Sequence, residues 1–248
     1  MKKVILITGA SRGIGAEAAL LASRKGYHVC LNYCSNKEAA DSVIKTIEDE
    51  GGSGIAIQAD ISKEDEVDLL FSTMDRKFGR LDALVNNAGI LESQMELTEM
   101  SAARIKKIFE TNVFGSFYCT QRAITRMALK HGGTGGSIVN VSSVASRTGS
   151  PFEYIDYASS KGAIDTFTIG LSKEIASQGI RVNAVRPGFI YTDIHACGGD
   201  ADRVDKLRDH IPMKRGGYPE EVAAAILWLL SEEASYVSGS FIEIAGGR

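Results

Sequence analysis

Short apolar runs rich in β-branched residues alternate along this chain with longer segments of helical periodicity. Several runs are apolar at every position, which is typical of parallel strands buried on both faces. Strands are expected at 4–8, 28–33, 54–59, 83–85, 137–142, 181–185 and 240–245. Helices are expected at about 14–25, 37–50, 64–78, 101–130, 158–178 and 219–231. This alternation predicts a doubly wound α/β fold, a seven-stranded parallel sheet with helices on both faces.

One stretch breaks the alternation, namely residues 188–218, which are rich in glycine and polar residues and contain no clear strand. Irregular stretches of this length in an α/β domain are commonly binding loops, and this one leaves the sixth strand at its carboxyl end. We predict that it is a substrate-binding loop. The glycine-rich segment 132–136 is too short to separate two cores, so residues 1–248 are expected to form a single domain.

Composition excludes several kinds of partner. The net charge is −3 and the basic residues are scattered, which gives no reason to expect nucleic acid or an anionic membrane. No stretch approaches the ~18 uninterrupted apolar residues of a membrane span. The four cysteines show neither a CxxC pair nor metal-ligand spacing. We therefore expect free thiols in a reducing compartment, a cytoplasmic protein, and no structural disulfide or metal.

A glycine-rich turn joins the first strand to the first helix, with Gly9, Gly13 and Gly15 spaced Gly-x-x-x-Gly-x-Gly. Glycine lets the backbone turn tightly and approach a pyrophosphate, whose charge the helix N-terminus stabilises. Such a turn also occurs as a plain strand-to-helix connection. Its place after the first strand of a βαβ unit favours a dinucleotide and a Rossmann-type sheet.

Charge at the end of the second strand indicates which dinucleotide is bound. A carboxylate there would accept hydrogen bonds from a ribose 2′-hydroxyl and repel a 2′-phosphate. The strand ends instead with Asn32, Tyr33, Cys34 and Ser35. Arg12 in the glycine-rich turn offers a planar cation for a phosphate, although a lone loop arginine is commonly just solvated. Together these features favour NADP(H) over NAD(H).

Tyr157 and Lys161 lie four residues apart in an expected helix and therefore share one face. A free tyrosine has a pKa of about 10, and a nearby ammonium favours the phenolate and lowers that pKa. Alone, the pair is a weak signal, because most such pairs are an amphipathic tyrosine and a surface lysine.

Further landmarks occur in a fixed order around this pair. They are the turn at residues 8–15, Asp60, Asn86-Asn87-Ala88-Gly89, Asn112, Ser143, Tyr157 with Lys161, and Pro187-Gly188. With this ordered set the chain resembles the short-chain dehydrogenase/reductase family along essentially its full length. Within the family it looks most like bacterial NADP-type reductases of the sugar-dehydrogenase and 3-oxoacyl-reductase kind.

The resemblance implies four catalytic residues. Tyr157 would be the general acid in carbonyl reduction and the base in alcohol oxidation. Lys161 would lower the tyrosine pKa and hydrogen-bond the nicotinamide ribose, and Ser143 would hold the substrate oxygen. Asn112 would fix a water in a proton relay with Lys161. The family also leads us to expect a homotetramer acting on a small carbonyl or alcohol substrate.

The cofactor contacts implied by the resemblance run through the whole chain. Asp60 would accept from the adenine amino group, and the segment from Pro187 would wrap the nicotinamide carboxamide. The full set is Gly9, Ser11, Arg12, Gly13, Ile14, Gly15, Asn32, Ser35, Asp60, Ile61, Asn87, Ala88, Gly89, Tyr157, Lys161, Pro187, Gly188, Ile190 and Thr192.

Several alternatives remain open. Ser142 competes with Ser143 as the catalytic hydroxyl, although adjacent strand residues face opposite ways and only one can serve. His195 is expected to be merely exposed, and Cys197 has no base beside it in sequence. Plausible substrate-pocket walls, free of an arginine cluster, are Glu153, Tyr154, Ile190, His195 and Met213. A non-catalytic NADP-sensing or scaffold protein on the same fold is the alternative function.

Overall fold

The computed structural model describes residues 2–248, whose seven strands form one sheet. Every pairing is parallel, and the order across the sheet is β3-β2-β1-β4-β5-β6-β7. The strands are β1 (Val4–Ile7), β2 (His28–Tyr33), β3 (Ser53–Gln58), β4 (Ala83–Asn86), β5 (Gly136–Val141), β6 (Ile180–Pro187) and β7 (Phe241–Ile244). The predicted doubly wound, Rossmann-type sheet is confirmed. The strand order reverses direction between β1 and β4, which is where such sheets bind ligands.

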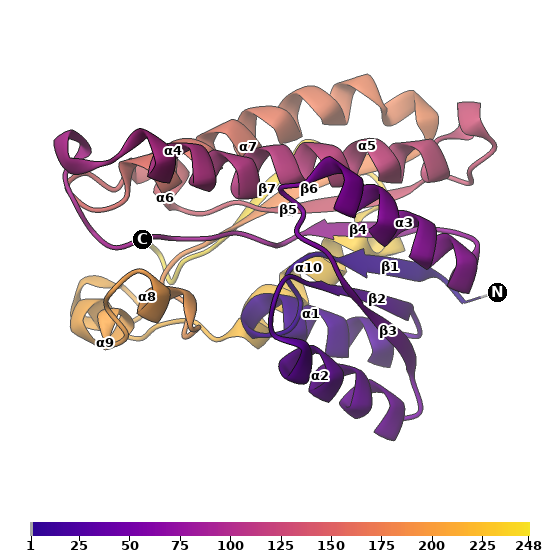
Figure 1. Cartoon of the computed structure of the whole chain (residues 1–248), viewed down its shortest axis with the longest axis horizontal. Coiled ribbons are helices and arrows are strands. Elements are labelled where there is room, and N and C mark those ends of the chain that lie inside the picture. Colours follow the sequence, from indigo (N-terminus) through magenta and orange to yellow (C-terminus); the bar gives the residue numbers. More distant parts are fainter. Residues whose placement is uncertain (1) are drawn as a thin grey trace.

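Helices cover both faces of the sheet (Figure 1). One layer contains α1 (Gly13–Arg24), α2 (Lys37–Asp49) and α10 (Pro219–Leu230), and the other contains α3 (Glu64–Phe78), α4 (Ala102–Phe109), α5 (Gly115–Met127) and α7 (Ile155–Glu174). Neighbouring strand residues serve opposite layers: Ile5 and Ile7 pack with α1 and α10, whereas Leu6 packs with α3 and α5. Both faces of β1 are therefore buried, as its uninterrupted apolar run predicts.

The expected helix at 101–130 is not continuous. After α4 the chain forms a π-helical turn, η2 (Glu110–Phe114), before α5 begins, and Ala128 is extended. Within this turn the side chain of Asn112 contacts the backbone of Ile90, so the wider turn coincides with a contact to another loop. Turns of this kind occur mostly as single insertions in α-helices, frequently at functional sites.

The remaining helices are short. They are α6 (Ala145–Thr148), α8 (Ile194–Cys197), α9 (Arg203–Leu207) and the 3₁₀ turns η1 (Leu97–Glu99), η3 (Leu129–His131), η4 (Ala176–Gln178), η5 (Arg208–His210) and η6 (Glu232–Ala234). Within residues 2–248, no helix combines the length and apolar character needed to cross a membrane.

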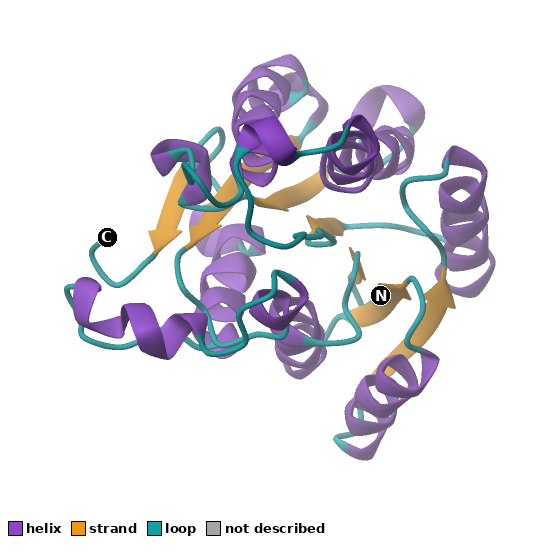
Figure 2. Cartoon of the chain, turned by 60° about the vertical axis from the view of Figure 1, so that its left-hand side comes forward, coloured by secondary structure: helices purple, strands orange, loops and turns teal. Residues whose placement is uncertain are grey.

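The stretch 188–218 carries more structure than its composition indicates, because it includes α8, α9 and η5. Side-chain contacts hold it: the Tyr191 hydroxyl donates to Asp205 at 2.7 Å, and the Tyr154 hydroxyl donates to the Gly198 carbonyl at 3.1 Å. Figure 2 shows the loops from the carboxyl ends of the strands lying between the two helical layers.

Gly15 allows the first helix to start close to the turn that follows β4. A Cβ at Gly15 would lie 2.5 Å from Nδ2 of Asn87 and 2.7 Å from the Gly9 carbonyl oxygen. The same Asn87 amide donates to the carbonyls of Thr8 at 2.8 Å and Gly9 at 3.0 Å. Gly15 thus makes room for the contact that joins the β1 and β4 turns.

We expect Gly15→Ala to lower the free energy of unfolding by about 1–3 kcal/mol, because the new methyl group overpacks this contact. Gly170→Ala is the matched control, since a Cβ at this exposed position of α7 meets nothing within 4 Å. That control should leave stability unchanged or raise it by up to about 1 kcal/mol, the helix preference for alanine. Urea denaturation measures both, and equal effects would contradict the packing role of Gly15.

Candidate active site

A cavity of about 1080 Å³ opens at the carboxyl ends of the strands. It is lined by all of the predicted cofactor residues except Gly15, namely Gly9, Ser11, Arg12, Gly13, Ile14, Asn32, Ser35, Asp60, Ile61, Asn87, Ala88, Gly89, Tyr157, Lys161, Pro187, Gly188, Ile190 and Thr192. Its volume is at the upper end of the range for small-molecule and cofactor pockets. Gly15 lies outside this lining and packs closely against Asn87 and Gly9.

The glycine-rich turn is shaped by two residues with left-handed backbone. Gly9 has φ of 61° and Gly13 has φ of 55°, values that favour glycine. A Cβ at Gly9 would lie only 2.8 Å from the Cα of Ala88. On the same side, Oγ1 of Thr8 accepts from the backbone N–H groups of Asn87 and Ala88, both at 3.0 Å. The turns after β1 and β4 therefore form one joined wall of the cavity.

Asn32 lines the cavity, but its side chain is engaged with the protein. Its Oδ1 accepts from the Gly9 N–H at 3.2 Å, and its Nδ2 donates to the Ala59 carbonyl at 3.0 Å. The residue is only 2% exposed. This amide thus ties together the ends of β1, β2 and β3 at the cavity wall.

Arg12 projects from the glycine-rich turn at the cavity rim. Its guanidinium lies 3.7 Å from the carboxylate of Asp193 and 3.8 Å from the sulfur of Cys197. Both charged side chains are more than half exposed, so the pair contributes little stability. The guanidinium consequently stays available to an anion entering the cavity.

Tyr157 and Lys161 both come from the first two turns of α7, as their spacing predicts. The Lys161 Nζ lies 5.5 Å from the centre of the Tyr157 ring and donates to the Val141 carbonyl at 2.7 Å. Burial lowers the pKa of Lys161 to about 8, while the charge of Asp165 acts in the opposite direction. The ammonium is therefore a buried cation held on a main-chain oxygen at the end of β5.

The pKa of Tyr157 departs from the expectation. Burial raises it to about 12, although a hydrogen bond with Ser143 acts to lower it. Desolvation of the phenolate outweighs any help from the nearby ammonium, because a buried charged form loses its hydration. At neutral pH the protein by itself holds this tyrosine as a protonated phenol.

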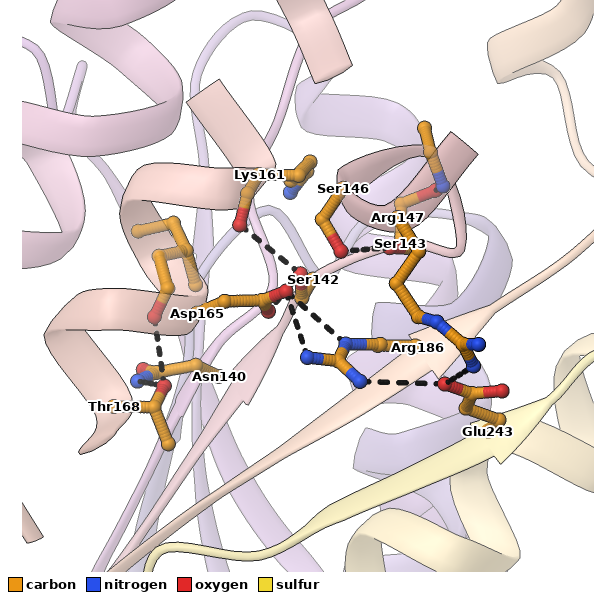
Figure 3. Close-up of polar contacts among 12 residues, drawn as sticks. Asn140, Ser142, Ser143, Ser146, Arg147, Lys161, Asp165, Thr168, Arg186 and Glu243 are labelled. Atoms are coloured by element: carbon orange, nitrogen blue, oxygen red, sulfur yellow. Dashed lines mark hydrogen bonds and ion pairs between the residues drawn. The ribbon is translucent and has the colours of Figure 1, made fainter. Parts of the chain in front are cut away.

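The two neighbouring serines have different partners (Figure 3). Oγ of Ser143 accepts from the Ala145 N–H at 3.1 Å, and this hydroxyl also acts to lower the pKa of Tyr157. Ser142 donates to Oδ1 of Asp165 at 2.6 Å and is only 2% exposed. Both serines line the cavity, but the Ser142 hydroxyl is engaged with Asp165 and with the Lys161 carbonyl, which leaves Ser143 as the hydroxyl that can meet a substrate.

Asn112 is 1% exposed and does not line the cavity. Its Oδ1 accepts from the Ile90 N–H at 2.8 Å, and its Nδ2 donates to the Ile90 carbonyl and to Ser160, both at 3.1 Å. A Cβ at Gly89 would lie 3.4 Å from Nζ of Lys161 and 3.5 Å from Oδ1 of Asn112. The amide thus holds the 89–90 segment beside Lys161.

The far wall of the cavity comes from α8, α9 and the segment before α7. His195 lies there at 9% exposure, contrary to the expectation of a merely exposed loop residue. Its Nε2 lies 3.0 Å from the carbonyl oxygen of Ile190, and burial lowers the pKa of the His195 imidazole. A carbonyl only accepts, so the neutral imidazole must carry its proton on Nε2. Nδ1 is buried and has no hydrogen-bond partner among the described residues.

Other wall residues partly match the expectation. Glu153, Tyr154, Ile190 and also Cys197 line the cavity, whereas Met213 lies elsewhere. Sequence reasoning missed Arg203 and Arg248, which both stack on the Phe189 ring. They are remote in sequence and carry no local motif. Asp165 was also missed, although its position four residues after Lys161 on the same helix face was a usable signal.

Comparison with known proteins identifies relatives of the chain. A family model described as Enoyl-(Acyl carrier protein) reductase matches residues 9–248. The chain is 58% identical over 245 residues to the uncharacterised oxidoreductase YgfF of Escherichia coli, covering 99% of both chains. It is 36% identical over 247 residues to the 3-oxoacyl-[acyl-carrier-protein] reductase FabG of Staphylococcus epidermidis, covering 100% of this chain and 99% of that protein.

A solved structure with the same fold is the 3-ketoacyl-(acyl-carrier-protein) reductase of Brucella melitensis complexed with NADH. It superposes with a TM-score of 0.92 at 32% identity, covering 99% of this chain and 98% of that chain. The chain belongs to the short-chain dehydrogenase/reductase family. It is an oxidoreductase for which a nicotinamide cofactor is expected.

Proposed function

We propose that this protein is an NADP(H)-dependent oxidoreductase that moves hydride between nicotinamide and a carbonyl or alcohol carbon, with Tyr157 as general acid and base. One observation carries the proposal. A phenol, a serine hydroxyl and a buried ammonium meet in the same cavity as a glycine-rich turn at the switch point of a parallel sheet.

The cavity fits a dinucleotide at both ends. At one end, the left-handed glycines expose the turn before α1, whose helix N-terminus favours a pyrophosphate. At the other, Gly89 leaves open the space beside Lys161 that a side chain would fill. The residues proposed to hold the cofactor are the 18 cavity-lining positions named above, with Asp60 toward adenine and 187–192 toward the nicotinamide. When bound, the nicotinamide supplies or accepts the hydride.

The protein's own residues manage the proton. In carbonyl reduction Tyr157, which is protonated at neutral pH, donates its proton to the substrate oxygen. Ser143 donates a hydrogen bond to the same oxygen and thus stabilises the charge that develops there. Lys161 stabilises the phenolate that Tyr157 becomes, and we propose that it also bonds the nicotinamide ribose. Asn112 holds the 89–90 segment against it, and any relay water would lie beside this segment.

The substrate side suits a small polar carbonyl or alcohol compound. Arg203 is paired with Glu153 at 2.6 Å and is largely buried, so their charges offset one another. Its guanidinium also stacks on Tyr154 and Phe189. Sugars or polyols, acyl-thioester ketones and small xenobiotic ketones remain the candidate classes, since pocket lining decides such preferences.

We also propose a cytoplasmic homotetramer. Apolar side chains are exposed on the outer faces of η2, α5 and α7, with Phe114 at 47%, Phe117 at 39% and Ile169 at 43% exposure. Clustered exposed apolar residues are typical of subunit interfaces. The proposed location rests on the cysteine pattern, which has neither a CxxC pair nor metal-ligand spacing.

Tyr157→Phe should reduce turnover of NADPH with a panel of ketones and aldehydes by about 10²–10⁴-fold, because the proton donor is lost. NADPH affinity, measured by fluorescence titration, should change little. Tyr154→Phe is the control: it removes a hydroxyl from the same cavity that donates to the Gly198 carbonyl, so activity should persist. If wild type and Tyr157→Phe were equally inert while both bound NADPH, the non-catalytic alternative would be favoured.

Arg12→Ala should raise the Kd for NADPH by about 10–100-fold, the value of a lost hydrogen bond to a charged group. The Kd for NADH, which has no 2′-phosphate, serves as the internal control and should not change. A wild-type preference for NADH in the same titrations would overturn the NADP(H) assignment.

The pH dependence of carbonyl reduction should report the ionisation of Lys161. Its pKa of about 8 means that the ammonium is present below this pH and is lost above it. Thus kcat/KM for NADPH in carbonyl reduction, which reports ionisations of the free enzyme, should be level near neutral pH and fall through about pH 8. In Lys161→Arg the guanidinium stays protonated, so this fall in kcat/KM at alkaline pH (the alkaline limb) should vanish, even though the variant is slower than wild type. A wild-type profile that stays level to pH 9.5 would contradict the assignment.

A further inference from the structure

A network of charged and polar groups lies next to the site and includes Ser142, Asp165 and Arg186 (Figure 3). Its inner member is Asp165, one helical turn after Lys161 and two after Tyr157 on α7. The Asp165 side chain is 12% exposed and does not line the cavity. It therefore cannot meet the substrate or cofactor directly.

The two carboxylate oxygens of Asp165 have separate partners. Oδ1 accepts from the Ser142 hydroxyl at 2.6 Å. Oδ2 accepts from Nε of Arg186 at 3.1 Å and from its NH2 at 2.9 Å. Ser142 directly precedes Ser143, and Arg186 directly precedes the 187–192 segment. One carboxylate thus ties α7 to both strand ends that carry proposed site residues.

The outer part of the network balances the charge. Arg186 also bonds Glu243 of β7 at 3.2 Å and stacks on the ring of Phe241, and Arg147 of α6 bonds the same Glu243. Two arginines and two carboxylates therefore alternate along the network. Arg186 keeps one carboxylate partner when Asp165 is neutralised, so the network can be tested without leaving a bare buried cation.

The surroundings of Lys161 single out the same residue. On α7, Tyr157 precedes Lys161 by four residues and Asp165 follows it by four, so all three share one helix face. Strand β5 brings the Val141 carbonyl to Lys161, and the turn after β4 brings Gly89 with Asn112 behind it. Asp165 is the one carboxylate in this set. Among the described residues, Lys161 forms no ion pair within 4.0 Å. The Asp165 carboxylate, which is paired with Arg186, therefore acts on the pKa of Lys161 as a nearby charge without direct contact.

We propose that Asp165 is a positioning residue of the reaction proposed above: through Ser142 it holds the Ser143 end of β5 against α7, and its negative charge favours the ammonium form of Lys161. A purely structural ion pair would need only Arg186. Asp165 instead uses one oxygen for Ser142 and lies on the helix face of Tyr157 and Lys161. The two parts of the proposal, hydrogen bond and charge, separate experimentally.

Two variants make this separation. Asp165→Asn removes the charge but keeps an oxygen that accepts from Ser142, whereas Ser142→Ala removes the hydrogen bond but keeps the charge. Asp165→Asn should move the alkaline limb of kcat/KM for NADPH down by about one pH unit, the effect of losing a nearby opposite charge. Ser142→Ala should lower kcat by about tenfold, because a misplaced site residue slows the reaction, with the limb unmoved.

Glu243→Gln is the control, because it disturbs the outer network and leaves the contact of Asp165 with Arg186 intact. It should change neither the limb nor kcat. If Glu243→Gln reproduced the kinetic effects of both inner variants, the network would be only structural and the proposal would fail.

Direct titration of Lys161 by ¹³Cε NMR, assigned with Lys161→Met, gives a readout that needs no turnover. An unshifted titration in Asp165→Asn overturns the charge part of the proposal. A titration that shifts while the kinetic limb stays fixed supports the action of Asp165 on Lys161 and instead contradicts the proposed role of Lys161 in the reaction. The two failures are thereby distinguishable.

Discussion

The parallel pairing of β1 with β4 organises the whole site. Ile5, Leu6 and Ile7 pair with Ala83, Leu84 and Val85, so the first strand of the chain lies beside the fourth at the centre of the sheet. The sheet continues from β1 through β2 to β3 on one side, and from β4 through β5 and β6 to β7 on the other. The turns that leave β1 and β4 therefore diverge, and a crevice forms between them. Because all strands are parallel, the ends of β5 and β6 reach the same edge. Residues more than a hundred positions apart consequently line one cavity.

The joined turns show how strongly this edge is fixed. Four hydrogen bonds join these turns: the Thr8 hydroxyl accepts from the N–H groups of Asn87 and Ala88, and the Asn87 amide donates to the carbonyls of Thr8 and Gly9. All four involve a backbone group, and leaving a backbone group without a partner costs more than a hydrogen bond gains. A second polar layer lies below, where the Asn86 amide donates to Asn140 at 2.8 Å and the Asn140 amide donates to Thr168 at 2.9 Å. Polar groups inside a parallel sheet thus fix β4, β5 and α7 in one register.

Much of this arrangement was predictable from the sequence, because it depends on periodicity and on ordered landmarks. The seven apolar runs marked the strands to within a few residues, and the spacing of Tyr157 and Lys161 placed them on one helix face. The interruption at Asn112 was not predictable, since it coincides with a contact to Ile90, which lies 22 residues earlier. The burial of His195 and the stacking of Arg203 and Arg248 on Phe189 likewise depend on how the 188–218 stretch folds back, which local pattern does not encode.

The pKa of Tyr157 illustrates the same limit and sharpens the proposed mechanism. Sequence spacing suggested that a lysine would make the tyrosine more acidic, but in the structure burial acts on both groups in opposite senses, raising one pKa to about 12 and lowering the other to about 8. Environments that push two pKa values apart define separate acid and base roles. A protonated phenol beside an ammonium that is retained at neutral pH is the state required at the start of carbonyl reduction. On the proposed mechanism alcohol oxidation begins from the phenolate, which burial in the protein by itself disfavours.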